Sequence, residues 1–228
     1  MKIGILQTGI VPENLAENHG QFPDMFARFL DGNGFEFEAF AVVEGKFPAS
    51  IRDCDGWLIT GSKHAAYEDH PWIPPLEDFI REAYGEGVPI VGVCFGHQVM
   101  AQALGGTVEK FGGVWGVGNR EYTHPDGTTS TLLAMHQDQV VEVPPEATVT
   151  ATADYCKNAG FAYKGKAMSI QPHPEFDAPF MEDLISERAG SVIPTDQADP
   201  AMQSLDQEND TPKHAREIAD FFLENAPA

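Results

Sequence analysis

The sequence predicts an α/β fold with a mostly parallel central sheet flanked by helices and a small antiparallel portion. Two observations lead to this prediction. Short β-branched runs recur along the chain with helix-period segments between them, the pattern of parallel strands joined by crossover helices. In addition, the run Val88–Val93 (VPIVGV) is apolar throughout, as expected of a central parallel strand covered on both faces.

The first part of the chain supplies most of the expected parallel sheet. Apolar runs predict strands at Lys2–Thr8, Phe35–Val43, Gly56–Thr60 and Val88–Val93. Apolar residues at helical spacing predict helices between them, over 23–30 and 74–84. Asn33-Gly34 supplies a stop signal for the first helix, and Gly85 and Gly87 end the second.

A further helix is expected directly after Val88–Val93, because apolar residues repeat every fourth position from Phe95 until Gly105-Gly106. Beyond it we expect short strands, some antiparallel, at Leu132–Met135, Gln139–Val143, Ala147–Ala151 and Ala167–Ile170. A C-terminal helix opens at Thr211-Pro212 and carries an apolar stripe formed by Ala215, Ile218, Ala219 and Phe222.

Residues 177–210 hold nine acidic side chains against the single Arg188, which predicts a solvated face or a mobile loop. No linker composition divides the chain, so we expect one domain over 1–228. Its catalytic body covers about 1–176, and the acidic loop and C-terminal helix cover about 177–228.

Composition excludes several classes of protein. The net charge of −21 over 228 residues argues against binding to nucleic acid or to an anionic membrane surface. A hydrophobic content of 42% is too high for a disordered acidic chain. The three cysteines, Cys54, Cys94 and Cys156, are too few and uneven for a disulfide framework, so a reducing, cytoplasmic location is expected. Residues 87–108 lack formal charge but include Pro89 and several glycines, which disfavour a membrane span.

The segment from Gly92 to Gln98 (GVCFGHQ) places Cys94 between a predicted buried strand and a predicted helix, with glycine two residues away on each side. Small flanking residues allow a strained turn that presents one side chain above the sheet edge, as in a nucleophile elbow. The free N–H groups and dipole of a helix start also stabilise a thiolate. Cys94 is therefore the predicted nucleophile, whereas Cys54 and Cys156 lack such surroundings.

A nucleophilic cysteine needs a base, and the base needs a group that orients its ring. The segment Gln171–Phe176 (QPHPEF) follows a predicted strand directly, and its two prolines stiffen it. In extended backbone, residues two apart point to the same face, so His173 and Glu175 can approach each other. The sequence therefore predicts a Cys94, His173, Glu175 triad.

The combination of Gly-x-Cys-x-Gly-His-Gln with a distant Pro-His-Pro-Glu resembles the class I glutamine amidotransferase family, from the first strand to about Phe176. The resemblance implies a flavodoxin-like sheet. It also implies that Cys94 attacks the side-chain amide of glutamine, that His173 exchanges the proton and that Glu175 orients His173. A γ-glutamyl thioester forms, ammonia leaves, and water releases glutamate.

The resemblance also implies the substrate contacts. The oxyanion hole would use the backbone N–H of Phe95 and that of Gly61, which follows the predicted strand Gly56–Thr60. Gln98, at the end of the elbow motif, would hold the amino-acid head of the substrate. The segment His136-Gln137-Asp138 resembles the loop that lines the same pocket.

Departures from the family pattern leave more than one function open. Lys63 stands where many synthetase-linked members have glycine, and no phosphate-binding loop motif is found. A glutaminase would therefore pass its ammonia to a separate synthetase or acceptor enzyme. The loop after Gly61 looks more like that of stand-alone members, some of which are γ-glutamyl peptidases, so hydrolysis of γ-glutamyl compounds by the same triad is the alternative. No cofactor or metal is expected in either case.

A metal-binding or regulatory protein is the third hypothesis, based on the Cys94 and His97 spacing, and a catalytically silent family member is the fourth. Other residues that attract notice are expected to be structural. His64, His70 and Trp72 are interpreted as ordinary loop residues, and Trp57 and Trp115 as packing residues.

Overall fold

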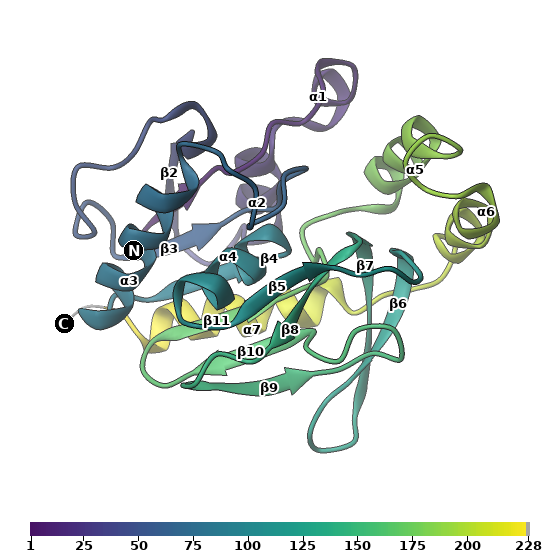
Figure 1. Ribbon diagram of the computed structural model, residues 1–228. Coiled ribbons are helices and arrows are strands. Elements are labelled where there is room, and N and C mark those ends of the chain that lie inside the picture. The colour runs from purple at the N-terminus through teal and green to yellow at the C-terminus, as the bar shows by residue number, and fades with distance from the viewer. Residues whose placement is uncertain (227–228) are drawn as a thin grey trace.

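A seven-stranded sheet forms the centre of the computed structural model, which describes residues 1–226, with strand order β2-β1-β3-β4-β11-β10-β9 (Figure 1). Five neighbouring strands, from β2 to β11, are parallel, and β10 and β9 continue the sheet antiparallel. The predicted fold class is confirmed. The strands span Lys2–Leu6 (β1), Glu36–Phe40 (β2), Gly56–Ile59 (β3), Ile90–Val93 (β4), Ala147–Ala151 (β9), Gly160–Tyr163 (β10) and Ala167–Ile170 (β11).

Helices cover both faces of this sheet. Helices α3 (Ile73–Gly85) and α4 (Phe95–Ala103) pack on one face, and α2 (Phe22–Phe29) and α7 (Thr211–Glu224) pack on the other (Figure 1). Side chains of one strand alternate between the two cores: Trp57 and Ile59 of β3 join the α3–α4 core, and Leu58 joins the α2–α7 core. This two-sided burial explains why the central strands are apolar at every position.

Two antiparallel ribbons form the small antiparallel portion that the sequence predicts. Strand β5 (Thr107–Lys110) pairs with β8 (Asp138–Glu142), and β6 (Gly116–Thr123) pairs with β7 (Thr129–His136). Strands β5, β6 and β10 were not expected from the sequence. They are short or rich in glycine and polar residues, so period-2 apolar alternation is weak in them, and pairing with a neighbour decides their conformation.

Most of the acidic side chains of 177–210 are exposed, as expected of a solvated face, but the loop expected as the alternative is replaced by two helices. This stretch forms α5 (Ala178–Arg188) and α6 (Thr195–Ser204), which pack with α1 (Glu13–His19) and the β6–β7 ribbon around a third core. The Asp177 side chain caps α5 by accepting a hydrogen bond from the Phe180 N–H at 2.9 Å. The acidic residues lie on the outer face, while Phe180, Met181, Leu184 and Ile185 are buried.

The η1 turn (Val42–Glu44) completes the elements and replaces the end of the strand predicted over Phe35–Val43. None of the helices within residues 1–226 is both long and apolar enough to cross a membrane. All three cysteines are buried free thiols. Trp57 is fully buried and meets Phe79 of α3 edge to face, with ring centroids 4.9 Å apart, in agreement with its predicted packing role.

Candidate active site

The predicted chemical residues follow the carboxyl ends of three neighbouring parallel strands. Gly61 lies just beyond β3, Cys94 follows β4 directly, and His173 lies just beyond β11. Because the carboxyl ends of parallel strands meet at one edge of the sheet, residues far apart in sequence come together there. This edge is the usual ligand-binding position in open α/β sheets.

Cys94 adopts a backbone conformation that side chains rarely occupy. Its φ is +53°, and no other non-glycine residue among 1–226 has a positive φ. It occupies the N-cap position of α4. A Cβ at Gly92 would lie 2.5 Å from the Gly96 carbonyl oxygen, so strand and helix approach too closely for any side chain there. The glycines on both sides of Cys94 therefore permit the strained turn that the sequence predicts.

His173 is held in one orientation by two neighbours. Its Nδ1 lies 2.8 Å from Glu175 Oε1, and both side chains are almost fully buried. The Phe176 ring stacks on the imidazole with centroids 4.0 Å apart and planes 6° from parallel. The His173 N–H also donates to the Leu133 carbonyl at 2.8 Å, which ties this segment to β7. The contact of Phe176 with the imidazole was not predicted from the sequence.

The electrostatic surroundings favour a charged imidazolium. Burial disfavours the charged form of His173, but the neighbouring Cys94 and the Glu175 carboxylate outweigh burial and raise the pKa of His173 to about 10. The charge of Cys94 is a main cause of this rise in the pKa of His173, and the Cys94 Sγ lies 4.0 Å from the Met135 carbonyl oxygen. An imidazolium next to a cysteine is the arrangement required for a thiolate nucleophile and a proton donor.

The other two cysteines have the opposite environment. Burial raises the pKa of Cys54 to about 11 and that of Cys156 to about 12, so both remain thiols at neutral pH. Cys94 alone of the three lines the cavity described below. The structure therefore agrees with the prediction that Cys54 and Cys156 are not nucleophiles.

Backbone N–H groups are available next to Cys94. Phe95 is the first residue of α4, so its N–H has no partner within the helix. Gly61 lies against the His173 ring, where a Cβ would come within 2.6 Å of His173 Cε1. A side chain at position 61 is therefore incompatible with the observed position of the imidazole.

Gly61→Ala is expected to lower kcat/KM by about 10²-fold, because displacing a catalytic group by about 1 Å costs this much. Gly85→Ala is the matched control, since a Cβ at Gly85 meets nothing within 4 Å. Steady-state kinetics together with thermal unfolding of both variants tests this expectation. Equal activity of the two folded variants would show that the Gly61 contact does not position His173.

A cavity of about 450 Å³ opens over Cys94. Four of the predicted substrate residues line it: Gln98, His136, Gln137 and Asp138. The amide nitrogen of Gln98 donates to the Asp138 carbonyl oxygen at 2.9 Å, so these two residues hold each other. Burial lowers the pKa of His136 to about 4, which keeps this imidazole neutral.

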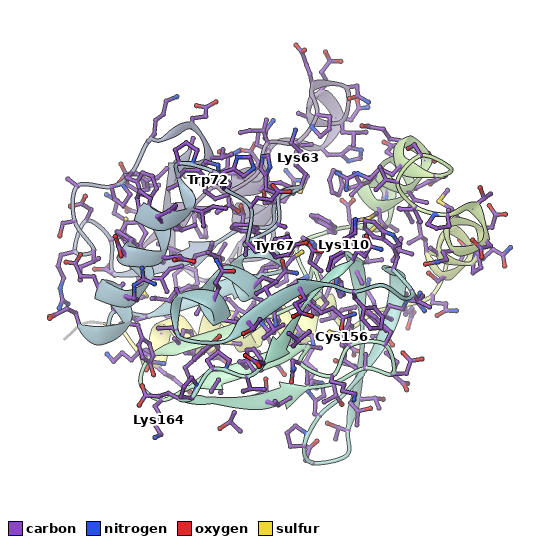
Figure 2. The ribbon with its side chains drawn as sticks, in the orientation of Figure 1. Lys63, Tyr67, Trp72, Lys110, Cys156 and Lys164 are labelled. Carbon is purple, nitrogen blue, oxygen red and sulfur yellow. The ribbon has the colours of Figure 1, made fainter. Side chains whose placement is uncertain are left out.

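The structure adds residues to the cavity. Of these, the sequence had singled out only Lys63 as a departure from the family pattern, since it stands where many synthetase-linked members have glycine. The loop after β3 contributes Lys63, His64 and Tyr67, β5 contributes Lys110, and Trp115 lies directly before β6. Arg188 at the end of α5, with Ser191 and Val192 between α5 and α6, completes this set. Figure 2 shows Lys63, Tyr67 and Lys110 gathered in the same region, whereas Lys164 lies at the far edge of the molecule. His64 and Trp115 thus line the cavity, whereas the sequence favoured an ordinary loop residue over a substrate contact at His64 and a packing residue at Trp115.

The histidine next to Cys94 in the sequence does not face the cavity. His97 is fully buried, with Nδ1 2.8 Å from Ser169 Oγ and Nε2 3.0 Å from the Asn158 carbonyl oxygen. Burial lowers its pKa to about 3. Because both ring nitrogens have protein partners, the hypothesis of a Cys94 and His97 metal site has no support. Among residues 1–226, only His64, Glu68 and His70 bring three candidate metal-ligand atoms within 4.8 Å of one another.

Comparison with known proteins gives concordant results. The family model "Glutamine amidotransferase class-I" matches residues 15–185. Gamma-glutamyl peptidase 4 of Arabidopsis thaliana is 28% identical over 93% of this chain and 91% of its own length. A glutamine-hydrolyzing GMP synthase subunit from Halobacterium salinarum is 31% identical over 71% of this chain and 87% of its own length. The crystal structure of a glutamine amidotransferase from Methylobacillus flagellatus superposes with a TM-score of 0.79 at 21% identity, covering 99% of this chain and 95% of that one.

Proposed function

The chain belongs to the class I glutamine amidotransferase family, and from this premise we propose that it hydrolyses the amide bond at the γ-carbonyl of a glutamyl substrate, with Cys94 as the nucleophile. The single observation that carries the proposal is the juxtaposition at one sheet edge. Cys94, in its strained turn, lines the main cavity, and the buried His173 and Glu175 pair follows the neighbouring strand β11, with His173 lining a recess that shares Lys63 and Arg188 with that cavity. Each of the three side chains has the neighbours that a cysteine-dependent acyl transfer requires.

The first half of the proposed reaction forms an acyl-enzyme. The Cys94 sulfur attacks the γ-carbonyl carbon, and the N–H groups of Phe95 and Gly61 stabilise the developing oxyanion. The C–N bond breaks as the His173 imidazolium gives its proton to the leaving nitrogen. The products of this half are a γ-glutamyl thioester on Cys94 and a free amine or ammonia.

The second half regenerates the enzyme. The now neutral His173 takes a proton from water, and the resulting hydroxide attacks the thioester carbon. The C–S bond breaks, glutamate leaves, and the Cys94 thiolate again faces the His173 imidazolium. Glu175 stays ionised throughout and stabilises the charged ring from Nδ1.

Two substrates fit this chemistry, and they differ only in the leaving group. A γ-glutamyl peptide or conjugate is the first candidate, because the Arabidopsis gamma-glutamyl peptidase aligns with 93% of this chain. An alignment of this extent includes the segment that forms α5 and α6. Glutamine is the second candidate, favoured by the similarity to a glutamine-hydrolysing synthase subunit. In that case the ammonia would go to a separate synthetase or acceptor subunit.

Glutamate release by the purified full-length chain, measured from glutamine and from γ-glutamyl dipeptides, tests the proposal. We expect the dipeptides to have the higher kcat/KM, and intact-mass analysis of quenched samples to show a γ-glutamyl adduct on Cys94. If the chain hydrolysed glutamine but none of the dipeptides, glutamine would replace the γ-glutamyl peptides as the first candidate. If no substrate released glutamate and no adduct formed on Cys94, the proposed reaction would be refuted.

A further inference from the structure

The cavity over Cys94 concentrates positive charge in a strongly acidic protein. The chain has 14 basic residues against 35 acidic ones, yet Lys63, Lys110 and Arg188 all line this cavity. Over residues 1–226, the structure shows no ion pair or hydrogen bond from the cationic groups of these three side chains. Cations that lack a direct ion-pair partner and are grouped around a cavity attract an anionic ligand.

The acidic residues of the same cavity are already engaged. Asp138 Oδ1 accepts a hydrogen bond from the Tyr67 hydroxyl at 3.1 Å. Glu68 Oε2 lies 2.8 Å from His70 Nε2 and 3.3 Å from His64 Nδ1. These carboxylates are held by Tyr67 and the two histidines and not by Lys63, Lys110 or Arg188, and the three cations outnumber the two carboxylates that line the cavity.

Arg188 differs from the two lysines because it is partly withdrawn from solvent. It ends α5, and burial lowers the pKa of its guanidinium, although the neighbouring Glu187 and Cys94 oppose this effect. The Glu187 carboxylate accepts a hydrogen bond from the Asn14 amide at 3.1 Å and makes no ion pair with Arg188. A half-buried guanidinium without a partner gains more from a bound carboxylate than an exposed lysine does.

A second, smaller recess shows on which side of Cys94 Arg188 lies. This recess of about 40 Å³ contains His173 and Phe176 and is also lined by Lys63 and Arg188. Lys110, Gln98 and Asp138 line only the main cavity. Because His173 must give its proton to the leaving nitrogen, the leaving group lies on the His173 side, which is the side of Arg188 and Lys63.

We propose that Arg188, assisted by Lys63, binds a carboxylate on the leaving amine. The enzyme then selects γ-glutamyl amino acids and peptides over glutamine, whose leaving group is ammonia and carries no carboxylate. This inference rests on the proposed γ-glutamyl hydrolysis and names its substrate class. One residue of the leaving peptide spans at most about 3.3–3.6 Å, so the carboxylate of a short peptide stays close to the scissile bond.

Arg188→Gln tests the proposal through a ratio of two kcat/KM values, one for a γ-glutamyl dipeptide and one for the same dipeptide with a C-terminal amide. We expect the unmodified chain to prefer the free acid by about 10- to 100-fold, the size of a charge-assisted hydrogen-bond effect, and Arg188→Gln to bring the ratio near one. Arg188→Lys should retain part of the preference, since it keeps charge but not the paired geometry. Lys164→Gln is the control, because Lys164 is exposed and lies far from the cavity (Figure 2).

Calorimetric binding of the same two dipeptides to Cys94→Ala separates this inference from the proposed reaction. Tighter binding of the free acid to Cys94→Ala than to the Cys94→Ala, Arg188→Gln double variant supports the subsite even if the chain hydrolyses neither dipeptide. Equal affinities for acid and amide, or a preference unchanged by Arg188→Gln in a variant that folds normally by circular dichroism, would overturn it. Hydrolysis without any acid preference would overturn the subsite and leave the proposed reaction standing.

Discussion

Cys94→Ser is expected to lower kcat/KM for γ-glutamyl substrates by at least about 10⁴-fold, the scale on which removal of a nucleophile acts in a catalytic triad. A serine hydroxyl is a much weaker nucleophile than a thiolate at neutral pH, and it cannot carry the negative charge through which Cys94 raises the pKa of His173. Glutamate release and the loss of the acyl adduct by intact mass measure the effect. Serine has nearly the same size as cysteine, so the thermal midpoint should change little.

Cys54→Ala is the matched control for this variant. Cys54 is also a buried free thiol, but it lies away from the cavity. We expect this variant to keep the acyl adduct and nearly all of the activity. If Cys94→Ser retained normal turnover, or if the adduct formed on Cys54 instead, the assignment of the nucleophile would be wrong.

Glu175→Gln is expected to lower kcat/KM by about 10²- to 10⁴-fold at neutral pH, in the range known for loss of the triad carboxylate. The neutral amide no longer stabilises the imidazolium across the 2.8 Å contact with Nδ1. The pKa of His173 should therefore fall. The unmodified enzyme should lose activity as pH rises through about 10, and Glu175→Gln should lose it at lower pH.

The raised pKa of His173 also predicts how the stability of the fold depends on pH. The folded-state pKa of His173 is raised above its ordinary value of 6.5, so the charged ring contributes fully to the free energy of unfolding below about pH 6.5. This contribution is lost as pH rises through about 10. Thermal unfolding between pH 6.5 and 10 should therefore show a larger loss of stability for the unmodified chain than for Glu175→Gln. If the thermal midpoints of the two proteins fell equally with pH, the Glu175 carboxylate would not be stabilising the His173 imidazolium.

Sequence reasoning located the strained turn at Cys94 because its signals are local. A buried strand, a turn between two glycines and a helix follow one another within about twenty residues, and the same short segment fixes the φ of Cys94. The His173 and Glu175 pair is equally local, since residues two apart in extended backbone share a face. Parallel strand order then brings the two segments to the same sheet edge.

The errors of sequence reasoning also have a physical cause. Over 177–210 the count of acidic residues outweighed the helical spacing of Phe180, Leu184 and Ile185, although this spacing was present in the sequence. A high count of charged residues indicates that a helix has one solvent-exposed face, whereas the spacing of apolar residues indicates that it also has a buried face. The cavity itself was beyond local prediction. Arg188 and Lys63 meet only because α5 packs near the loop after β3, a contact between distant segments.

The assembly of the site from three strand ends ties catalysis to the cooperativity of folding. Gly61, Cys94 and His173 belong to separate segments that meet only when β3, β4 and β11 pair in register. No single hairpin or helix pair contains more than one of these residues, so a partly folded chain has no functional site. During denaturant titration, loss of turnover should therefore coincide with loss of the central sheet. Glutamate release by the proposed reaction would therefore report how completely the parallel sheet is formed.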